Sequence, residues 1–176
     1  MGLFSYGSSC MDMSSLSAAY YRKHYPQIQQ AKYEQAWPFL KKHIPRKVES
    51  LLDIGIGYAW FEVLLKKKKM RLKRIMGVDV DELSIRPPRK NITYILDEDF
   101  ETEETFDLVI CWDAWHCFPK KNLLDWVKPT GLLLVSEPKP FVHVLEQLLT
   151  NKKLEILVDE WVGTMEKSRV VLARKI

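Results

Sequence analysis

Residues 51–58 read Leu-Leu-Asp-Ile-Gly-Ile-Gly-Tyr, an apolar run that ends in an acidic residue and two glycines one position apart. The apolar residues suit a strand that is buried on both faces, and Gly55 and Gly57 permit backbone angles that a Cβ would forbid. A helical pattern begins at Trp60, so the backbone N–H groups of its first turn should face the crevice where the strand ends. Many α/β folds bind an adenosine-containing ligand at such a crevice.

Strands and helices alternate along the rest of the chain. Strand patterns occupy residues 72–79, 91–96, 106–111 and 132–136, and this alternation predicts a parallel sheet. Two further strands, 154–161 and 168–175, are joined by a short loop, so the last strand should run antiparallel. We expect a single α/β domain over residues 1–176, a Rossmann-like three-layer sandwich with a mostly parallel seven-stranded sheet and an antiparallel last strand.

The N-terminal segment is rich in aromatic residues. Residues 14–43 have a helical pattern, with Pro26 as the expected interruption. We expect residues 1–46 to form a helical lid over a cofactor-binding core, residues 47–176. The substrate pocket would then be lined by Tyr20, Tyr21 and Tyr25, whereas ordinary helix packing is the simpler interpretation for the later aromatic residues of this segment.

Composition excludes several classes of protein. Of the 176 residues, 47% are hydrophobic, which argues against disorder. No stretch approaches the roughly 18 apolar residues of a membrane span, and the first residues lack the order of a signal peptide, so we expect a cytoplasmic protein with no membrane partner. The cysteines and histidines are scattered, without the spacing of a zinc site, and we expect reduced thiols and no metal. These residues are Cys10, Cys111, Cys117, His24, His43, His116 and His143.

Acidic residues end two of the predicted strands. Asp79 closes the second strand, 22 positions after Gly57 (79 − 57). In nucleotide-binding α/β units an acidic residue about 20 positions beyond the glycines accepts hydrogen bonds from ribose hydroxyls. Asp97 follows the third strand, where it can contact an adenine amino group or belong to a solvated acidic loop.

The fourth strand runs into Trp112-Asp113-Ala114-Trp115-His116, an unusual group of side chains at a strand's carboxyl end. His116 is the candidate general base, because an imidazole can exchange a proton near neutral pH, and Asp113 is the second catalytic candidate. The alternatives are a helix cap for Asp113 and packing for the two tryptophans, of which Trp115 is otherwise a candidate for the substrate pocket.

Four motifs in this order and spacing resemble the class I S-adenosylmethionine-dependent methyltransferases, specifically the small single-domain type that acts on small molecules. They are Leu51 to Gly57, Gly77-Val78-Asp79, Phe106-Asp107-Leu108-Val109 and Val127-Lys128-Pro129-Thr130-Gly131. The resemblance implies that Asp53, Gly55 and Gly57 shape the turn around the methionine moiety of the cofactor. It further implies that Asp79 holds the ribose, that Asp97 lies near adenine, and that Cys111 and Trp112 lie beside the sulfonium.

One residue departs from the family pattern. Ala59 stands where a third glycine is common, and we expect it to be tolerated at a negative φ.

Three alternatives to a small-molecule methyltransferase remain. A nicotinamide-dependent dehydrogenase would need a glycine at position 60, which is Trp. An RNA methyltransferase would use the basic run at residues 66–74, although this run lacks the interleaved aromatic residues that stack on bases. A non-catalytic S-adenosylmethionine-binding domain would keep the fold and the ligand. The sequence specifies neither the acceptor nor the oligomeric state.

Overall fold

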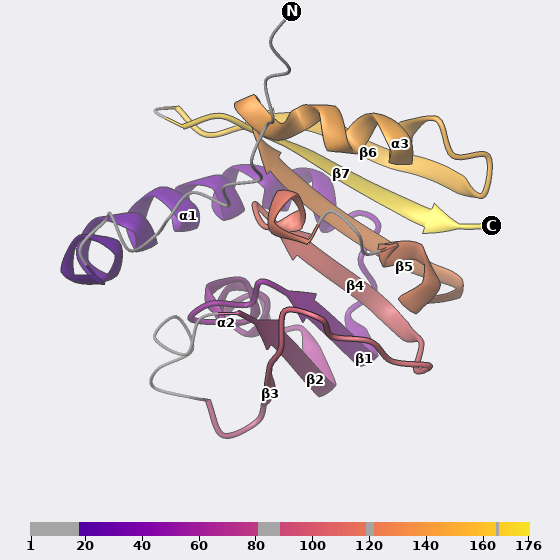
Figure 1. The fold of residues 1–176 in the computed structure, drawn as a ribbon, viewed down its shortest axis with the longest axis horizontal. Helices are drawn as coiled ribbons and strands as arrows, with labels where there is room; N and C mark the ends of the chain where they lie inside the picture. The colour runs from indigo at the N-terminus through magenta and orange to yellow at the C-terminus, as the bar shows by residue number, and fades with distance from the viewer. Residues whose placement is uncertain (1–17, 81–88, 119–121, 165) are drawn as a thin grey trace, which may run out of the picture.

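The computed structural model describes residues 18–80, 89–118, 122–164 and 166–176, except for the side chains of residues 18–24. Its centre is a seven-stranded sheet with the order β3-β2-β1-β4-β5-β7-β6 (Figure 1). All neighbouring strands pair in parallel except at β7, which is antiparallel to both β5 and β6. The predicted sheet is therefore confirmed. Its strands are β1 (Lys47–Ile54), β2 (Arg71–Asp79), β3 (Thr93–Leu96), β4 (Phe106–Trp112), β5 (Val127–Pro138), β6 (Leu154–Val162) and β7 (Ser168–Lys175).

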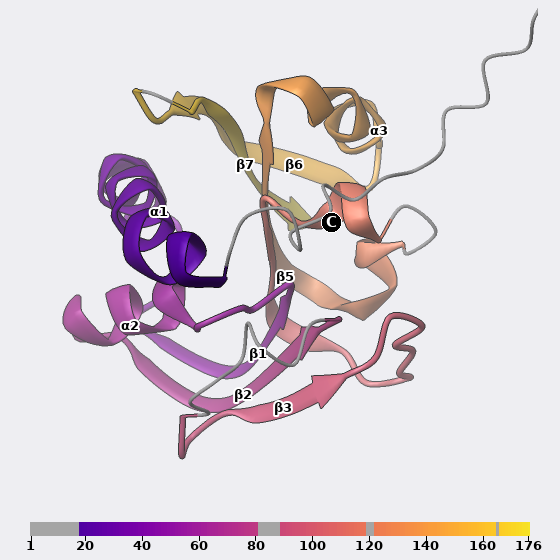
Figure 2. The same cartoon turned by 60° about the vertical axis from the view of Figure 1, so that its left-hand side comes forward.

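Helices cover both faces of the sheet, as Figure 2 shows. On one face lie α1 (Ala18–Leu40) and α2 (Trp60–Lys67), and on the other lie short 3₁₀ helices and α3 (Glu146–Leu149). The 3₁₀ helices are η3 (Trp115–Cys117), η4 (Leu123–Trp126) and η5 (Lys139–Leu145). None of the described helices is long and apolar enough to cross a membrane.

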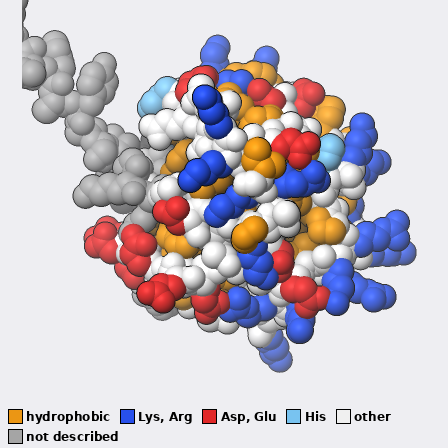
Figure 3. Space-filling view, turned by 90° about the vertical axis from the view of Figure 1, so that its right-hand side faces the viewer, with side chains coloured by type: hydrophobic (Ala, Val, Ile, Leu, Met, Phe, Trp, Pro, Cys, Tyr) orange, Lys and Arg blue, Asp and Glu red, His pale blue; other side chains and the backbone are white. Residues whose placement is uncertain are grey.

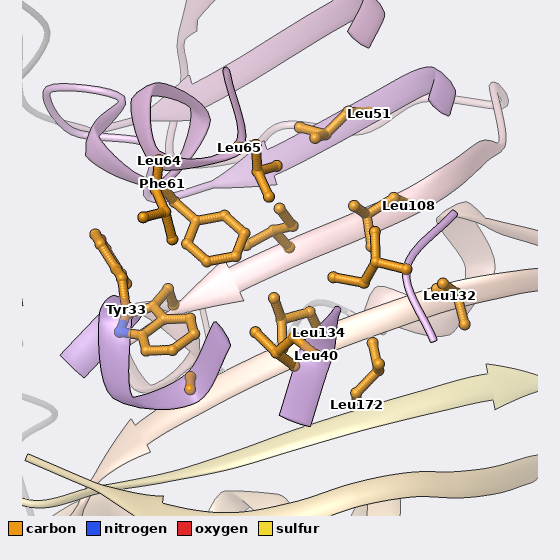
Figure 4. Close-up of a cluster of buried hydrophobic side chains, with 14 of the residues drawn as sticks. Tyr33, Leu40, Leu51, Phe61, Leu64, Leu65, Leu108, Leu132, Leu134 and Leu172 are labelled. Carbon is orange, nitrogen blue, oxygen red and sulfur yellow. The ribbon is translucent and has the colours of Figure 1, made fainter. Parts of the chain in front are cut away.

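Two hydrophobic cores form because the strands are buried on both faces. Successive residues of a strand point to opposite faces, so Leu51 joins the core under α1 and α2 while Leu52 joins the other. Both side chains are fully buried. Figure 4 shows the first core, in which Tyr33 of α1 and Phe61 of α2 lie in the same apolar layer as the leucines of the sheet.

Two local expectations were wrong. The first helix continues through Pro26 to Leu40, so the proline does not end it, because packing of the rest of α1 holds both halves together. Cys117 is disulfide-bonded and not reduced, whereas Cys111 is a free, buried thiol.

The strand order reverses at the carboxyl ends of β1 and β4. From β1 the chain passes to β2 on one side, and it later returns to β4 on the other side of β1. Ligands of open α/β sheets bind at such a reversal of strand order. We refer to the carboxyl ends of the parallel strands as the carboxyl edge and to their opposite ends as the amino edge.

Candidate functional site

The turn after β1 is fixed to the end of β2. Gly55 has a φ of 74° and Gly57 a φ of 50°, which are left-handed values that favour glycine. The backbone N–H groups of Gly55 and Ile56 donate to the carbonyl oxygen of Val78, at 2.8 and 3.1 Å. Ala59 has a φ of 54°, so the negative φ at which we expected an alanine to be tolerated is not present. The chain thus accepts strain at Ala59 to bring α2 back over the sheet.

Gly55 also lies against the loop after β4. A Cβ placed on Gly55 would come within 2.4 Å of the Cβ of Ala114, which is closer than atoms can pack. The loop after β1 and the loop after β4 are therefore in direct contact at this point.

Asp79 lies at the end of β2, where the glycine turn reaches it. Its Oδ2 accepts the backbone N–H of Gly57 and its Oδ1 accepts the backbone N–H of Val80, both at 2.8 Å. The residue is only 7% exposed. These two backbone donors fix the carboxylate in orientation, at the place where the sequence predicts the ribose contact.

Asp53 of β1 faces Glu62 of α2 in the interior. Burial, followed by the charge of Glu62, raises the pKa of Asp53 well above its usual value, and burial also raises the pKa of Glu62. Neither carboxylate oxygen of Glu62 receives a hydrogen bond from a described N–H group or hydroxyl, and the hydrogen bond with the Asp53 carboxyl group opposes the rise in the pKa of Glu62. Two buried carboxyl groups side by side are costly when both are ionised, so this pair is suited to a cationic ligand group.

An aromatic cluster lines the same region. The indole of Trp112 stacks on Phe61, with ring centroids 5.4 Å apart, and meets Tyr33 edge to face at 4.8 Å. One face of the indole is thus covered by protein, which does not favour the expected contact of that face with a sulfonium. The indole Nε1–H is buried and has no acceptor among the described residues. Oε1 of Gln29 is also buried, and no described residue donates a hydrogen bond to it.

Asp113 is the centre of a buried polar network. Its Oδ2 accepts hydrogen bonds from Nζ of Lys32 at 2.8 Å, the side-chain amide of Gln29 at 3.1 Å and the hydroxyl of Ser168 at 3.2 Å. Its Oδ1 accepts the hydroxyl of Ser136 at 2.6 Å. Four donors, of which Lys32 also forms an ion pair, satisfy this carboxylate, so the geometry favours an organising role over proton transfer.

His116 pairs with a carboxylate that the sequence did not single out. Its Nδ1 lies 2.7 Å from Oε2 of Glu137, and its backbone N–H donates to Oε1 of Glu137 at 3.1 Å. The imidazole stacks on Phe141, with centroids 4.1 Å apart and ring planes 2° apart. Burial raises the pKa of Glu137, although the hydrogen bonds from His116 oppose this effect.

The remaining predicted site residues divide into three groups. Asp97 is exposed beside the end of β2, where its backbone N–H donates to the carbonyl of Asp79 at 3.1 Å. Cys111 and Trp115 belong to the core on the far face of the sheet, where Cys111 is fully buried, and this favours packing roles. The hydroxyl of Tyr25 accepts a hydrogen bond from Gln29 at 2.6 Å. The side chains of Tyr20 and Tyr21 lie outside the described residues.

The basic run lies at the other edge of the molecule. Residues 66–74 span the end of α2 and the start of β2, at the amino edge. Figure 3 looks onto this edge, around which Lys and Arg side chains gather. A pocket of about 360 Å³ opens there as well, lined among others by Lys47, Lys128 and Arg174. Neither feature borders the carboxyl edge. Among the described residues, no group of three or more acidic, His or Cys side chains is arranged to hold a metal ion.

Glu62, Glu137, Lys32 and Gln29 are the site residues that the sequence reasoning missed. Glu137 ends β5 just before a proline, so its place at the carboxyl edge was a usable signal. Glu62 and Lys32 stand on helices with ordinary polar spacing, and only packing reveals that they are buried.

No family model and no curated protein matches the chain. Solved structures do match its fold. Magnesium protoporphyrin IX methyltransferase from Synechocystis PCC 6803, solved with S-adenosylmethionine, is 14% identical with a TM-score of 0.60, over 96% of this chain and 99% of that one. The plantazolicin methyltransferase solved with a substrate analogue and S-adenosylhomocysteine is 13% identical with a TM-score of 0.66, over 94% and 91%. The ribosomal protein L11 methylase from Lactobacillus delbrueckii is 15% identical with a TM-score of 0.62, over 85% and 79%. The chain therefore has the fold of the class I S-adenosylmethionine-dependent methyltransferases, as its motifs predict.

Proposed function

We propose that this protein transfers a methyl group from S-adenosylmethionine to a small acceptor at the carboxyl edge of β1 and β4. The observation that carries the proposal is Asp79, whose carboxylate is held at the end of β2 by the backbone N–H groups of Gly57 and Val80. A fixed carboxylate beside a glycine turn is what recognition of ribose hydroxyls requires. Similar structures solved with this cofactor or its product support the same assignment.

The residues present fit the cofactor. Asp53 and Glu62 form a buried acidic pair whose pKa values are both raised by burial, and such a pair suits the ammonium group of the methionine moiety. Gly55 and Gly57 would shape the turn around that moiety, Asp79 would bind the ribose, and Asp97 would lie near adenine. Trp112 would form the wall behind the site, whereas the burial of Cys111 in the core on the far face favours packing. When bound, S-adenosylmethionine supplies an electrophilic methyl group on a positively charged sulfur.

His116 is assigned as the general base, and Asp113 is assigned to organising the edge through its ion pair with Lys32. Tyr20, Tyr21 and Tyr25 remain the candidates for the acceptor pocket, whereas the burial of Trp115 in the core favours packing. The alternative function is a domain that binds S-adenosylmethionine without catalysing transfer. Cofactor binding with no labelled product from any class of acceptor would support that alternative.

The test is calorimetric titration with S-adenosylhomocysteine. We expect Asp79→Asn to weaken binding at least tenfold, because hydrogen bonds from ribose hydroxyls to a charged acceptor are each worth about 1.5–3 kcal/mol. Glu160→Gln, which removes an exposed carboxylate on β6, should bind like the wild type. A thermal melt of each variant verifies folding, since Asp79 also holds the glycine turn. Equal affinity in folded Asp79→Asn and wild type would refute the assignment.

A further inference from the structure

Glu137 holds both the backbone and the ring of His116. Its side chain is fully buried at the end of β5, where one oxygen accepts the backbone N–H of His116 and the other lies 2.7 Å from Nδ1. The backbone N–H of His116 donates to this carboxyl group and favours its ionised form, against the burial that raises the pKa of Glu137. An ionised carboxylate can only accept, so with Glu137 ionised Nδ1 carries the proton, and the neutral His116 ring has its lone pair on Nε2.

The second ring nitrogen is left available. Phe141 covers one face of the imidazole, and the His116 side chain is 12% exposed. Nε2 makes no hydrogen bond to a described residue, and it is not among the described buried polar atoms that lack a partner. Nε2 thus reaches solvent while Glu137 and Phe141 restrain the ring.

The pair occupies the half of the carboxyl edge opposite Asp79. His116 follows β4 and Glu137 ends β5, and these strands are neighbours in the sheet, with Trp112 aligned to Ser136. Asp79 ends β2, on the far side of β1. With the nucleoside part of the cofactor held at β2, the β4 and β5 half of the edge is left for the acceptor.

We propose that Glu137 is a positioning residue that keeps His116 in the form of a general base, and that the acceptor is a hydroxyl compound, either an alcohol or a phenol. The inference rests on the proposed function. Carboxylates and most neutral amines can attack the methyl carbon without prior loss of a proton. The reactivity of a neutral hydroxyl, by contrast, increases most when a base removes its proton during transfer.

The reaction step balances with one proton transfer. Nε2 of His116 takes the hydroxyl proton as the acceptor oxygen forms its bond to the methyl carbon. The electron pair of the broken carbon–sulfur bond stays on sulfur, which becomes a neutral thioether. Glu137 stabilises the imidazolium, and His116 then releases the proton to water.

Glu137→Gln provides the sharpest test, because its amide can donate to Nδ1 and thereby allow the proton to move to Nε2. Ring ¹⁵N chemical shifts of labelled histidine should show the Nδ1–H tautomer for His116 in the wild type and a shift towards Nε2–H in the variant. His43 and His143 serve as internal controls. Glu146→Gln, which removes an exposed carboxylate of α3, should leave the tautomer unchanged. Observation of Nε2–H in the wild type overturns the proposal.

Methyl transfer is then measured with labelled S-adenosylmethionine and a panel of phenols, primary alcohols, benzoate, primary amines and thiols. We expect label on hydroxyl compounds, and a loss of about 100-fold or more in turnover for Glu137→Gln, with affinity for S-adenosylhomocysteine retained. Label on benzoate or amines, or on no hydroxyl compound, overturns the acceptor class. Failure of the wild type to bind S-adenosylhomocysteine overturns the proposed function itself. An unchanged tautomer in Glu137→Gln with intact binding refutes only the role of Glu137.

Discussion

Glu62 shows at the scale of one residue that the candidate site is built at the expense of stability. Its carboxyl group is buried beside Asp53, and its oxygens receive no hydrogen bond from a described N–H group or hydroxyl, so a proton shared with Asp53 is what relieves it. A core designed only for stability would not keep two acidic groups buried side by side. The same group becomes favourable when a cationic ligand lies against it, so we attribute Glu62 to binding.

Replacement of Glu62 by Gln should therefore stabilise the free protein and weaken cofactor binding. Burial raises the pKa of both Glu62 and Asp53 in the folded state, so the stability these groups contribute is full below the usual carboxyl pKa and is lost as pH rises through the raised values. The variant should gain about 1–3 kcal/mol in free energy of unfolding at neutral pH, and less below about pH 4. Urea denaturation at both pH values measures the difference. A destabilised variant at neutral pH, with Glu160→Gln unaffected, would contradict this interpretation.

At the scale of elements, one ion pair joins α1 to the carboxyl edge. Lys32 is fully buried, and its Nζ lies 2.8 Å from Asp113 after β4 and 2.7 Å from Glu166 in the turn between β6 and β7. The backbone N–H of Gly163 in the same turn donates to Gln35 of α1 at 2.7 Å. These contacts fasten the proposed lid helix to two separate parts of the sheet.

We expect Lys32→Met to destabilise the protein by about 3–5 kcal/mol, because Asp113 then keeps a buried charge without its cation. The double variant Lys32→Met/Asp113→Asn should recover part of the loss, since it removes both charges. Chemical denaturation of the wild type and of the single and double variants gives the coupling energy. Strict additivity of the two substitutions would show that the pair is not coupled.

At the scale of the whole molecule, the two edges of the sheet have different chemistry. The carboxyl edge carries the buried acidic pair and the His116–Glu137 pair, while the amino edge carries exposed cations. Lys66 and Lys69 are exposed there and form no ion pair with a described residue. An eight-residue strand separates the two edges by about 25 Å, more than twice the Debye length of about 8–10 Å in physiological salt. The basic run is thus poorly placed to act on the candidate cofactor site.

Neutralising Lys66 and Lys69 together to Ser should leave affinity for S-adenosylhomocysteine within about twofold of the wild type at physiological salt, since charges beyond a Debye length are screened. Calorimetry measures this. A larger change in affinity would show that charges at the amino edge influence binding at the carboxyl edge. The RNA methyltransferase alternative predicts that the wild-type protein shifts the mobility of RNA in a salt-sensitive way, and that the Lys66/Lys69 variant weakens this shift. Absence of a shift at low salt would exclude it.

The sequence by itself determined the strands and the place of one carboxylate in the candidate site. Apolar runs identified the strands, and the spacing between Gly57 and Asp79 placed a carboxylate beside the glycine turn, because both features depend on local pattern along two neighbouring strands. Only the tertiary structure revealed that Lys32 reaches Asp113 across 81 positions and that Glu137 holds His116 across 21. Such pairs depend on strand register and helix packing, which bring distant residues together and decide which polar groups lose their water. Neither strand register nor helix packing can be predicted from periodicity along the chain.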